Sequence, residues 1–287
     1  MMIRSLLLSL VLIIVPVFSN AQEEERYEGG GKKFWSFLLE GDFRPFIEAY
    51  PGYGLMNHQG VSVDLPSMGV VGGKLGFREM RPIKRWGTRV KEHFVIGAYG
   101  SSSAPGGTEG AAGMTGSYWR IGTGERIGYG WTFGRQPLVP YHQFTFNYME
   151  PSLAVPAAIT GKDSMTLARA VDGGRFAMTT EGGVTAELFE TIGVSAGYEM
   201  SVLYTRVVFP QWFASYLIGA SAVGIISAFG EEIIEVSPVF GPILYFVLRN
   251  GVAYGLFYAW RDQMHWPFNS ETPLVLDTFK LDVSIRF

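Results

Sequence analysis

The sequence predicts an all-β membrane protein that folds as an antiparallel transmembrane β-barrel. Three observations lead to this prediction: the composition, the alternation of polar and apolar residues in several segments, and the pattern of the last nine residues. Aromatic residues make up 15% of the chain and charged residues only 17%, whereas a typical globular chain is about 25% charged. The 37 glycines follow no repeat, and barrel strands use glycine to bend and to pack closely.

The last nine residues alternate strictly between apolar and polar. The apolar set consists of Phe279, Leu281, Val283, Ile285 and Phe287, and the polar set of Lys280, Asp282, Ser284 and Arg286. Because successive side chains of a strand point to opposite faces, one face of this strand is wholly apolar and the other can meet water. Such a strand suits a wall between lipid and a hydrated interior.

Three internal segments repeat this alternation. Residues 126–134 place Ile127, Tyr129, Trp131 and Phe133 on one face, and residues 141–149 and 192–205 show the same pattern. Further candidate strands are 43–50, 68–79, 92–101, 113–122, 181–190, 243–248 and 252–260. The last two are joined across Asn250-Gly251, which is a strong hairpin signal. These segments predict about 10 strands, with 8 or 12 also possible, because single-chain bacterial barrels take even numbers.

The N-terminal region predicts export. Residues 1–21 have Arg4 in a short basic region, an apolar run, and small residues at Ser19 and Ala21, which is typical of a cleaved secretory signal peptide. Residues 22–33 carry three glutamates and three glycines in succession and predict a flexible periplasmic lead-in. The barrel is expected over residues 34–287.

Residues 212–230 do not fit a simple barrel strand. They contain no Asp, Glu, Lys, Arg or His, and as a helix they would be about 28 Å long. Three interpretations are open: a helix of a polytopic inner-membrane protein, a helix that lies against the barrel as a plug, lid or interfacial anchor, or two apolar strands. The second agrees best with the alternating segments elsewhere, and we expect one apolar helical insertion here.

Polar residues on the inward faces of separate strands are the candidate functional residues. They are Arg126, Gln143, Asn147 and Glu199. They either line a hydrated path or form a structural network that fills a small barrel.

The sequence offers little for catalysis or cofactor binding. There is no cysteine, and the four histidines form no cluster with metal-ligand spacing. We therefore expect no metal site, no cofactor and no catalytic residue. His142 is the candidate base if the barrel is an enzyme, but its position in the strand places it on the apolar face with Phe144 and Phe146. A net charge of −3 offers no basic surface for nucleic acid.

The alternating terminal strand, residues 127–133 and the N-terminal signal together resemble bacterial outer-membrane β-barrel proteins. The resemblance is one of architecture and matches no specific family. It implies residence in the outer membrane, contact with outer-membrane lipid, and recognition of the closing strand, Phe279 to Phe287, by the barrel-assembly machinery. The expected role is structural or that of a narrow, partly plugged channel. The alternatives are a lipid-modifying barrel enzyme and, less favoured, a helical inner-membrane protein.

Overall fold

A computed structural model of the chain describes residues 43–83, 87–134, 136–189 and 191–287, with the side chains of residues 231 and 235 excepted. The predicted signal peptide at 1–21, the predicted lead-in at 22–33 and the first residues of the predicted barrel, 34–42, lie outside the described residues.

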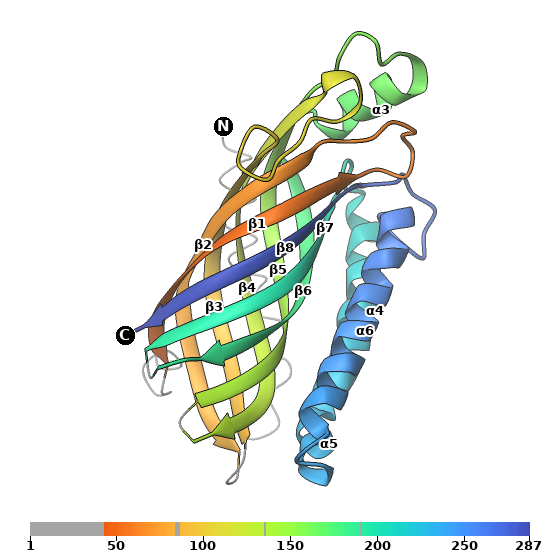
Figure 1. Cartoon of the computed structure of the whole chain (residues 1–287). Coiled ribbons are helices and arrows are strands. Elements are labelled where there is room, and N and C mark those ends of the chain that lie inside the picture. Colours follow the sequence, from red (N-terminus) through yellow and green to blue (C-terminus); the bar gives the residue numbers. More distant parts are fainter. Residues whose placement is uncertain (1–42, 84–86, 135, 190) are drawn as a thin grey trace, which may run out of the picture. The chain divides into compact units, whose positions relative to one another are not determined.

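The described part of the chain forms a closed barrel of eight antiparallel strands (Figure 1). Each strand pairs with its neighbour in the chain, and the barrel closes where β1 pairs with β8, from Phe46 opposite Arg286 to Asn57 opposite Val275. The strands are β1 (Arg44–Asn57), β2 (Ser67–Ile83), β3 (Gly87–Ser101), β4 (Thr115–Phe133), β5 (Gln136–Ala154), β6 (Arg175–Glu187), β7 (Ile192–Leu203) and β8 (Leu274–Arg286).

The alternation of the sequence becomes an apolar outside and a polar inside. In β8, Leu281 is 67% exposed on the outer face while the adjacent Asp282 is 2% exposed in the interior. The outward residues of β2 and β3 follow the same rule, with Leu75 62% and Val95 53% exposed. An exposed apolar wall around a charged interior is the reverse of a soluble protein.

The two ends of the barrel differ in their connections. At one end, called the turn end here, connections of at most four residues join β2 to β3, β4 to β5 and β6 to β7, and the last residue, Phe287, lies at this end. The opposite loop end carries the longer connections, which include the 3-10 helix η1 (Ala111–Gly113) and the helix α3 (Gly161–Ala170). The connection from β7 to β8, residues 204–273, is the longest of these.

The number of strands is eight instead of about ten, and two misread segments explain the difference. The predicted strands at 113–122 and 126–134 fall, apart from their outermost residues, in a single strand, β4. Residues 243–248 and 252–260 are not a hairpin, because both belong to one helix, α6 (Gly241–Asp262). The Asn250-Gly251 pair is helical: Asn250 Nδ2 donates a hydrogen bond to the carbonyl of Phe246 four residues earlier, at 3.0 Å.

The apolar segment predicted at 212–230 is helical and packs with α6 against the outside of the barrel. It forms α4 (Phe209–Ala228), which is followed by the short α5 (Gly230–Val236). Helix α4 runs from the loop end toward the turn end, α5 forms the tip, and α6 returns (Figure 1). The two-strand interpretation and the helical inner-membrane alternative are therefore wrong, and these helices do not plug the lumen.

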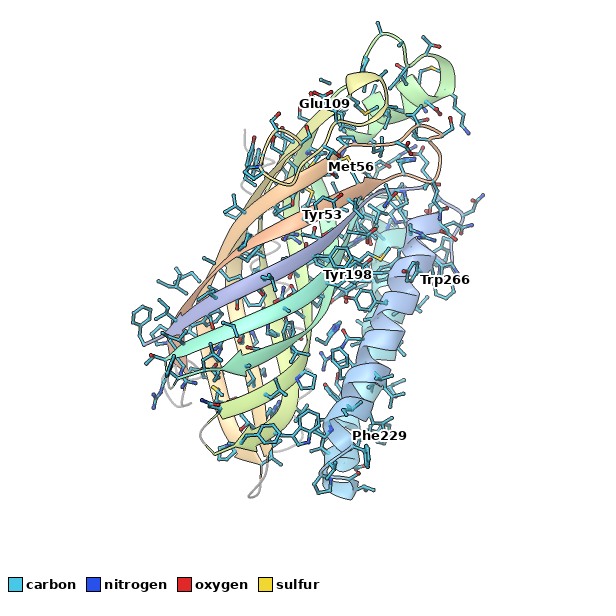
Figure 2. All side chains as sticks on the ribbon, in the orientation of Figure 1. Tyr53, Met56, Glu109, Tyr198, Phe229 and Trp266 are labelled. Atoms are coloured by element: carbon cyan, nitrogen blue, oxygen red, sulfur yellow. The ribbon has the colours of Figure 1, made fainter. Side chains whose placement is uncertain are left out.

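Helix α6 lies against the outer faces of β4 to β7. Near the loop end, Phe257 and Trp260 pack with Met178 of β6 and with Met200 and Val202 of β7. Tyr198 of β7 faces the helices (Figure 2) and stacks on Tyr254 of α6, with 5.5 Å between ring centroids. The hairpin made of α4, α5 and α6 thus covers one side of the barrel wall.

Candidate functional site

The barrel interior is lined with paired charges. Among the described residues, five cationic and six acidic side chains point inward from seven of the strands, and each residue is at most 6% exposed. They are Lys74, Arg78, Arg120, Arg126 and Lys280, and Glu48, Glu92, Glu181, Glu187, Glu199 and Asp282. A buried charge is costly unless it is paired and hydrogen-bonded, so the energetics of this interior depend on how these groups meet.

Arg126 of β4 reaches across the lumen. Its guanidinium donates two hydrogen bonds to Glu48 of β1, at 3.0 and 3.1 Å, and its Nε donates to Gln143 Oε1 of β5 at 3.1 Å. It also lies 3.8 Å from Asp282 Oδ2 of β8, and it stacks over the ring of Tyr141 at 4.1 Å. Because β4 and β8 are on opposite sides of an eight-stranded barrel, one side chain spans the interior.

A second layer of charges lies nearer the loop end. Arg120 of β4 donates to both carboxylate oxygens of Glu199 of β7, at 2.5 and 2.9 Å. Lys280 of β8 bridges two acids, since its Nζ donates to Glu199 Oε2 at 2.8 Å and to Glu181 Oε2 at 2.6 Å. Paired donors on a single carboxylate make a strong, geometrically defined contact.

A third group of contacts lies nearer the turn end. Arg78 of β2 donates to Glu92 of β3 at 2.7 Å and to Glu187 of β6 at 2.6 Å. At the level of Arg126, Lys74 of β2 donates to Glu48 at 2.5 Å and to Gln143 at 3.0 Å, so it also connects separate walls. Bonds between non-adjacent strands therefore cross the lumen at several heights.

The four residues predicted from the sequence all lie in the interior, and other side chains link them into one hydrogen-bond network. Arg126 bonds directly to Gln143, and Gln143 Nε2 donates to Glu181 at 2.6 Å. Glu199 joins the same network through Lys280. Asn147 joins the network only through hydroxyl groups: its Nδ2 donates to Thr179 Oγ1 at 2.8 Å, Thr179 Oγ1 bonds to Ser201 Oγ at 2.8 Å, and Ser201 Oγ donates to Glu199 at 3.4 Å.

Sequence reasoning missed Glu48 and Lys74, which hold the centre of the network. Both lie in strands where glycine and proline obscure the alternation, such as Gly72 to Gly76. The signal that could have identified Lys74 is its position as the one charged residue in a glycine-rich strand segment. The alternation places Lys280 and Asp282 on a polar face, but only the closed barrel shows which acidic and basic groups they contact.

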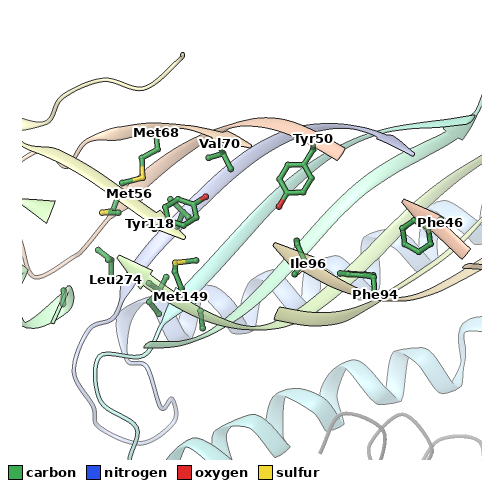
Figure 3. Packing of buried hydrophobic residues seen from close by; sticks show 14 residues of the cluster. Phe46, Tyr50, Met56, Met68, Val70, Phe94, Ile96, Tyr118, Met149 and Leu274 are labelled. Carbon is green, nitrogen blue, oxygen red and sulfur yellow. The ribbon is translucent and has the colours of Figure 1, made fainter. Parts of the chain in front are cut away.

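The loop end of the lumen is closed by apolar side chains. Met56, Met68, Tyr118, Met149 and Leu274 gather there, while Phe46 lies toward the turn end (Figure 3). The loops pack above them in a second cluster formed by Met114, Ile159 and Leu167. The Ser62 hydroxyl, in the loop from β1 to β2, bonds to Asp163 of α3 at 2.6 Å. These contacts hold a lid of loops over the charged layers.

His58 belongs to this lid. Burial lowers the pKa of its imidazole below the ordinary value of 6.5, so the ring is neutral at pH 7. Its Nδ1 can then accept a hydrogen bond from the main-chain nitrogen of Gly60 at 3.0 Å. The neutral ring fixes the beginning of the loop.

A separate group of polar residues lies outside the barrel wall, between α6 and strands β5 to β7. His142 of β5 is 4% exposed, and its Nδ1 lies 3.1 Å from Asn250 Oδ1 of α6. The Tyr254 hydroxyl accepts a hydrogen bond from the Gly182 nitrogen at 2.8 Å and donates to the Tyr198 carbonyl at 2.5 Å. His142 is therefore an interface residue, covered by a helix.

A shallow cavity of about 280 Å³ lies on the outer face of the wall near the loop end. It is lined by Tyr99, Trp119, Glu150 and Ser152 together with Gly173, which follows α3. Tyr99 and Trp119 belong to the exposed aromatic residues of the outer face. Because it opens on the outside, this cavity is not part of a route through the lumen.

An apolar exterior, a charged interior and a closed ring of strands define the class of protein. Only helices and closed barrels satisfy every backbone hydrogen bond within a bilayer. A closed barrel with short turns at one end, longer loops at the other and an outward apolar band has the architecture of an outer-membrane β-barrel. The chain is an eight-stranded barrel of this type.

Comparison with known proteins assigns no narrower family. No protein-family model matches the chain, and no curated protein matches it. Among solved structures, Neisserial surface protein A is 8% identical with a TM-score of 0.43, and the match covers 85% of this chain and 97% of that one. Ail, the attachment invasion locus protein of Yersinia pestis, in complex with the heparin analogue sucrose octasulfate, is 9% identical with a TM-score of 0.34 and coverages of 85% and 99%. With scores this low, the class assignment depends on the strand pairing and the polarity described above.

Proposed function

We propose that the chain is a structural protein of the outer membrane, exported with a cleaved signal peptide, whose barrel is closed to ions and solutes. The observation that carries this proposal is the position of Arg126. Its guanidinium contacts residues of β1, β5 and β8 at one height of the lumen, where an open channel would need a continuous column of water.

The surrounding bonds support a closed interior. Lys74 and Arg78 each join β2 to a strand on the far side of the barrel, β5 and β6 respectively. An ion that passed would have to displace several of these pairs at once. Breaking a buried pair costs about 3–5 kcal/mol when one partner is left behind, so the network opposes permeation while it stiffens the wall.

Planar-bilayer recording of the folded mature chain tests this proposal. We expect the current to stay at the level of the protein-free bilayer over a wide voltage range. Regular ohmic current steps from the wild-type chain would contradict a closed barrel and would favour the narrow channel.

A matched pair of variants identifies the residue that closes the lumen. Arg126→Ala removes the side chain that spans the interior, and we expect it to produce small current steps. Arg81→Ala removes an arginine whose side chain is 61% exposed on the outside of β2, and we expect no current. Equal currents from the two variants would show that the leak comes from general loosening of the barrel.

The position of His142 gives no support to the lipid-modifying alternative. A general base must reach the proton that it abstracts, and His142 is covered by α6 with Asn250 as its hydrogen-bond partner. The structural role therefore agrees better with the described residues.

A further inference from the structure

Helices α4 and α6 present a wide apolar surface away from the barrel. Outward side chains remain exposed along both helices: Ile218 by 41% and Ile225 by 61% in α4, and Leu244 by 48% and Val247 by 55% in α6. A contiguous exposed patch on this scale is rare on a soluble monomer and marks a surface that contacts lipid or another protein.

The charged residues of the hairpin avoid this surface. Helix α4 contains none, Glu231, Glu232 and Glu235 belong to the tip formed by α5, and Arg261 and Asp262 end α6. Arg249, within α6, is 5% exposed and donates to the hydroxyl of Ser227 at 2.8 Å and to that of Tyr245. Charges at both ends and an inward-facing arginine between them are what a membrane-spanning helix pair requires.

The dimensions of the helices also fit a bilayer. Helix α4 has 20 residues and α6 has 22, which correspond to about 30 and 33 Å, close to the thickness of the hydrocarbon core. Residues Phe209–Ile234 are long and apolar enough to cross a membrane, and only 22% of their most apolar window is buried. Helix α4 thus leaves most of its apolar surface open to its surroundings.

The hairpin continues the apolar band of the barrel. Where α6 covers the wall, the outward residues Met178, Thr180 and Met200 are at most 2% exposed, and the helices expose apolar side chains in their place. Strands that no helix covers expose apolar side chains of their own, such as Leu75 of β2. The polar side chains of α6, Asn250 and Tyr254, point to the barrel and bond to its main chain.

We propose that α4 and α6 lie within the lipid bilayer, inserted from the loop end, with the acyl chains of the membrane as the partner of their outward face. The tip formed by α5 reaches the interface at the turn end, which in outer-membrane barrels is the periplasmic side. The protein thereby combines a β-barrel and a transmembrane helical hairpin in one membrane.

Spin labels on the protein in liposomes test whether acyl chains contact the outward face of the helices. Each label can be attached to a single introduced cysteine, because the chain has no native cysteine. Ile225→Cys and Val247→Cys probe the outward face at two independent positions, and Leu75→Cys is the lipid-facing reference on the barrel. We expect all three labels to be accessible to dissolved oxygen and protected from a water-soluble nickel complex. Accessibility of the helix labels to nickel, or loss of oxygen accessibility with spin–spin broadening from a second copy, would overturn the proposal.

Labelling in intact cells tests the orientation. Val239→Cys, in the turn between the tip and α6, and Met165→Cys, in α3, replace side chains that are 64% and 60% exposed. A membrane-impermeant maleimide should label Met165→Cys at once and Val239→Cys only after the outer membrane is permeabilised. Immediate labelling of the tip in folded protein would show that the hairpin does not cross the membrane.

Discussion

The interior charges show how single residues fix the barrel. Glu199 illustrates the dependence: its carboxylate receives two hydrogen bonds from Arg120 and one from Lys280, and it is 0% exposed. A buried carboxylate that loses such partners cannot form hydrogen bonds to water in their place. The stability of the lumen therefore depends on complete pairs more than on the number of charges.

Arg120→Ala should destabilise the folded barrel by about 3–5 kcal/mol, because it leaves the buried Glu199 with a single cation. Tyr50→Phe is the matched control, since it removes only the hydroxyl that accepts a 3.2 Å bond from Arg120, and it should cost about 1 kcal/mol. Urea unfolding in lipid vesicles, followed by tryptophan fluorescence, measures both. Equal costs for the two variants would mean that the Arg120–Glu199 pair contributes little.

Gly182 governs how closely α6 approaches the wall. A Cβ atom at this position would lie 2.6 Å from Asn250 Oδ1, closer than real contacts allow. Gly182→Ala should push α6 outward, at a cost of about 1–3 kcal/mol typical of overpacking. Hydrogen exchange should then become faster in α6 and stay unchanged in β1 to β3.

Gly97→Ala is the control for this substitution. Gly97 also lies on the outer face, but a Cβ there would meet only the Arg120 carbonyl oxygen, at 4.0 Å. We expect unchanged exchange in α6. If hydrogen exchange in α6 is also unchanged in Gly182→Ala, the contact between Gly182 and Asn250 does not hold the helix in place.

At the scale of elements, alternation predicted the faces of the strands well. The inward positions of Arg126 and Gln143 follow from it, and so does the outward position of His142. Alternation works here because each strand has lipid or a helix on one side and polar groups on the other.

The same reasoning divided β4 into 113–122 and 126–134, on either side of the glycines at Gly122 and Gly124. These glycines make room inside the lumen: a Cβ at Gly122 would lie 2.3 Å from Asn147 Oδ1, and one at Gly124 2.9 Å from the Thr145 hydroxyl. Only the packing partners from β5 show why glycine occurs at these positions of a continuous strand, and a sequence does not show those partners.

Helix α6 was misread for a different reason. A helix between a barrel and lipid has apolar surroundings on both sides, so its sequence lacks the polar face that marks a helix in water. Its polar residues, Asn250 and Tyr254, mark the side that contacts the barrel, and without the barrel they resemble a turn and a strand residue. The position of the helices relative to the wall was therefore beyond the reach of periodicity.

At the scale of the whole molecule, Phe287 lies where the barrel closes. Its nitrogen donates to the Pro45 carbonyl of β1 at 3.0 Å, while its side chain is 65% exposed. The ring adds little to packing, so an effect of its loss on assembly would indicate recognition by another protein. This is the role that the resemblance to outer-membrane barrels implies.

Phe287→Asp should therefore reduce insertion into the outer membrane by the assembly machinery, as measured by the amount of heat-modifiable protein in membrane fractions. Phe133→Asp is the matched control, because Phe133 is 63% exposed near the turn end but internal in the chain, and it should insert normally. A similar loss of insertion for both variants would indicate that the aromatic ring acts through contact with lipid and not through recognition by the assembly machinery.

The order of the elements in the chain also suggests an order of folding. The residues of α4 to α6 come before β8, and β8 must pair both with β7, across residues 204–273, and with β1 at the start of the barrel. Contacts across long stretches of chain form late, because closing a long loop costs entropy before the contact repays it. We therefore expect the barrel to stay an open sheet until α4 to α6 have packed against its outer wall, with the pairing of β8 to β1 as the last step.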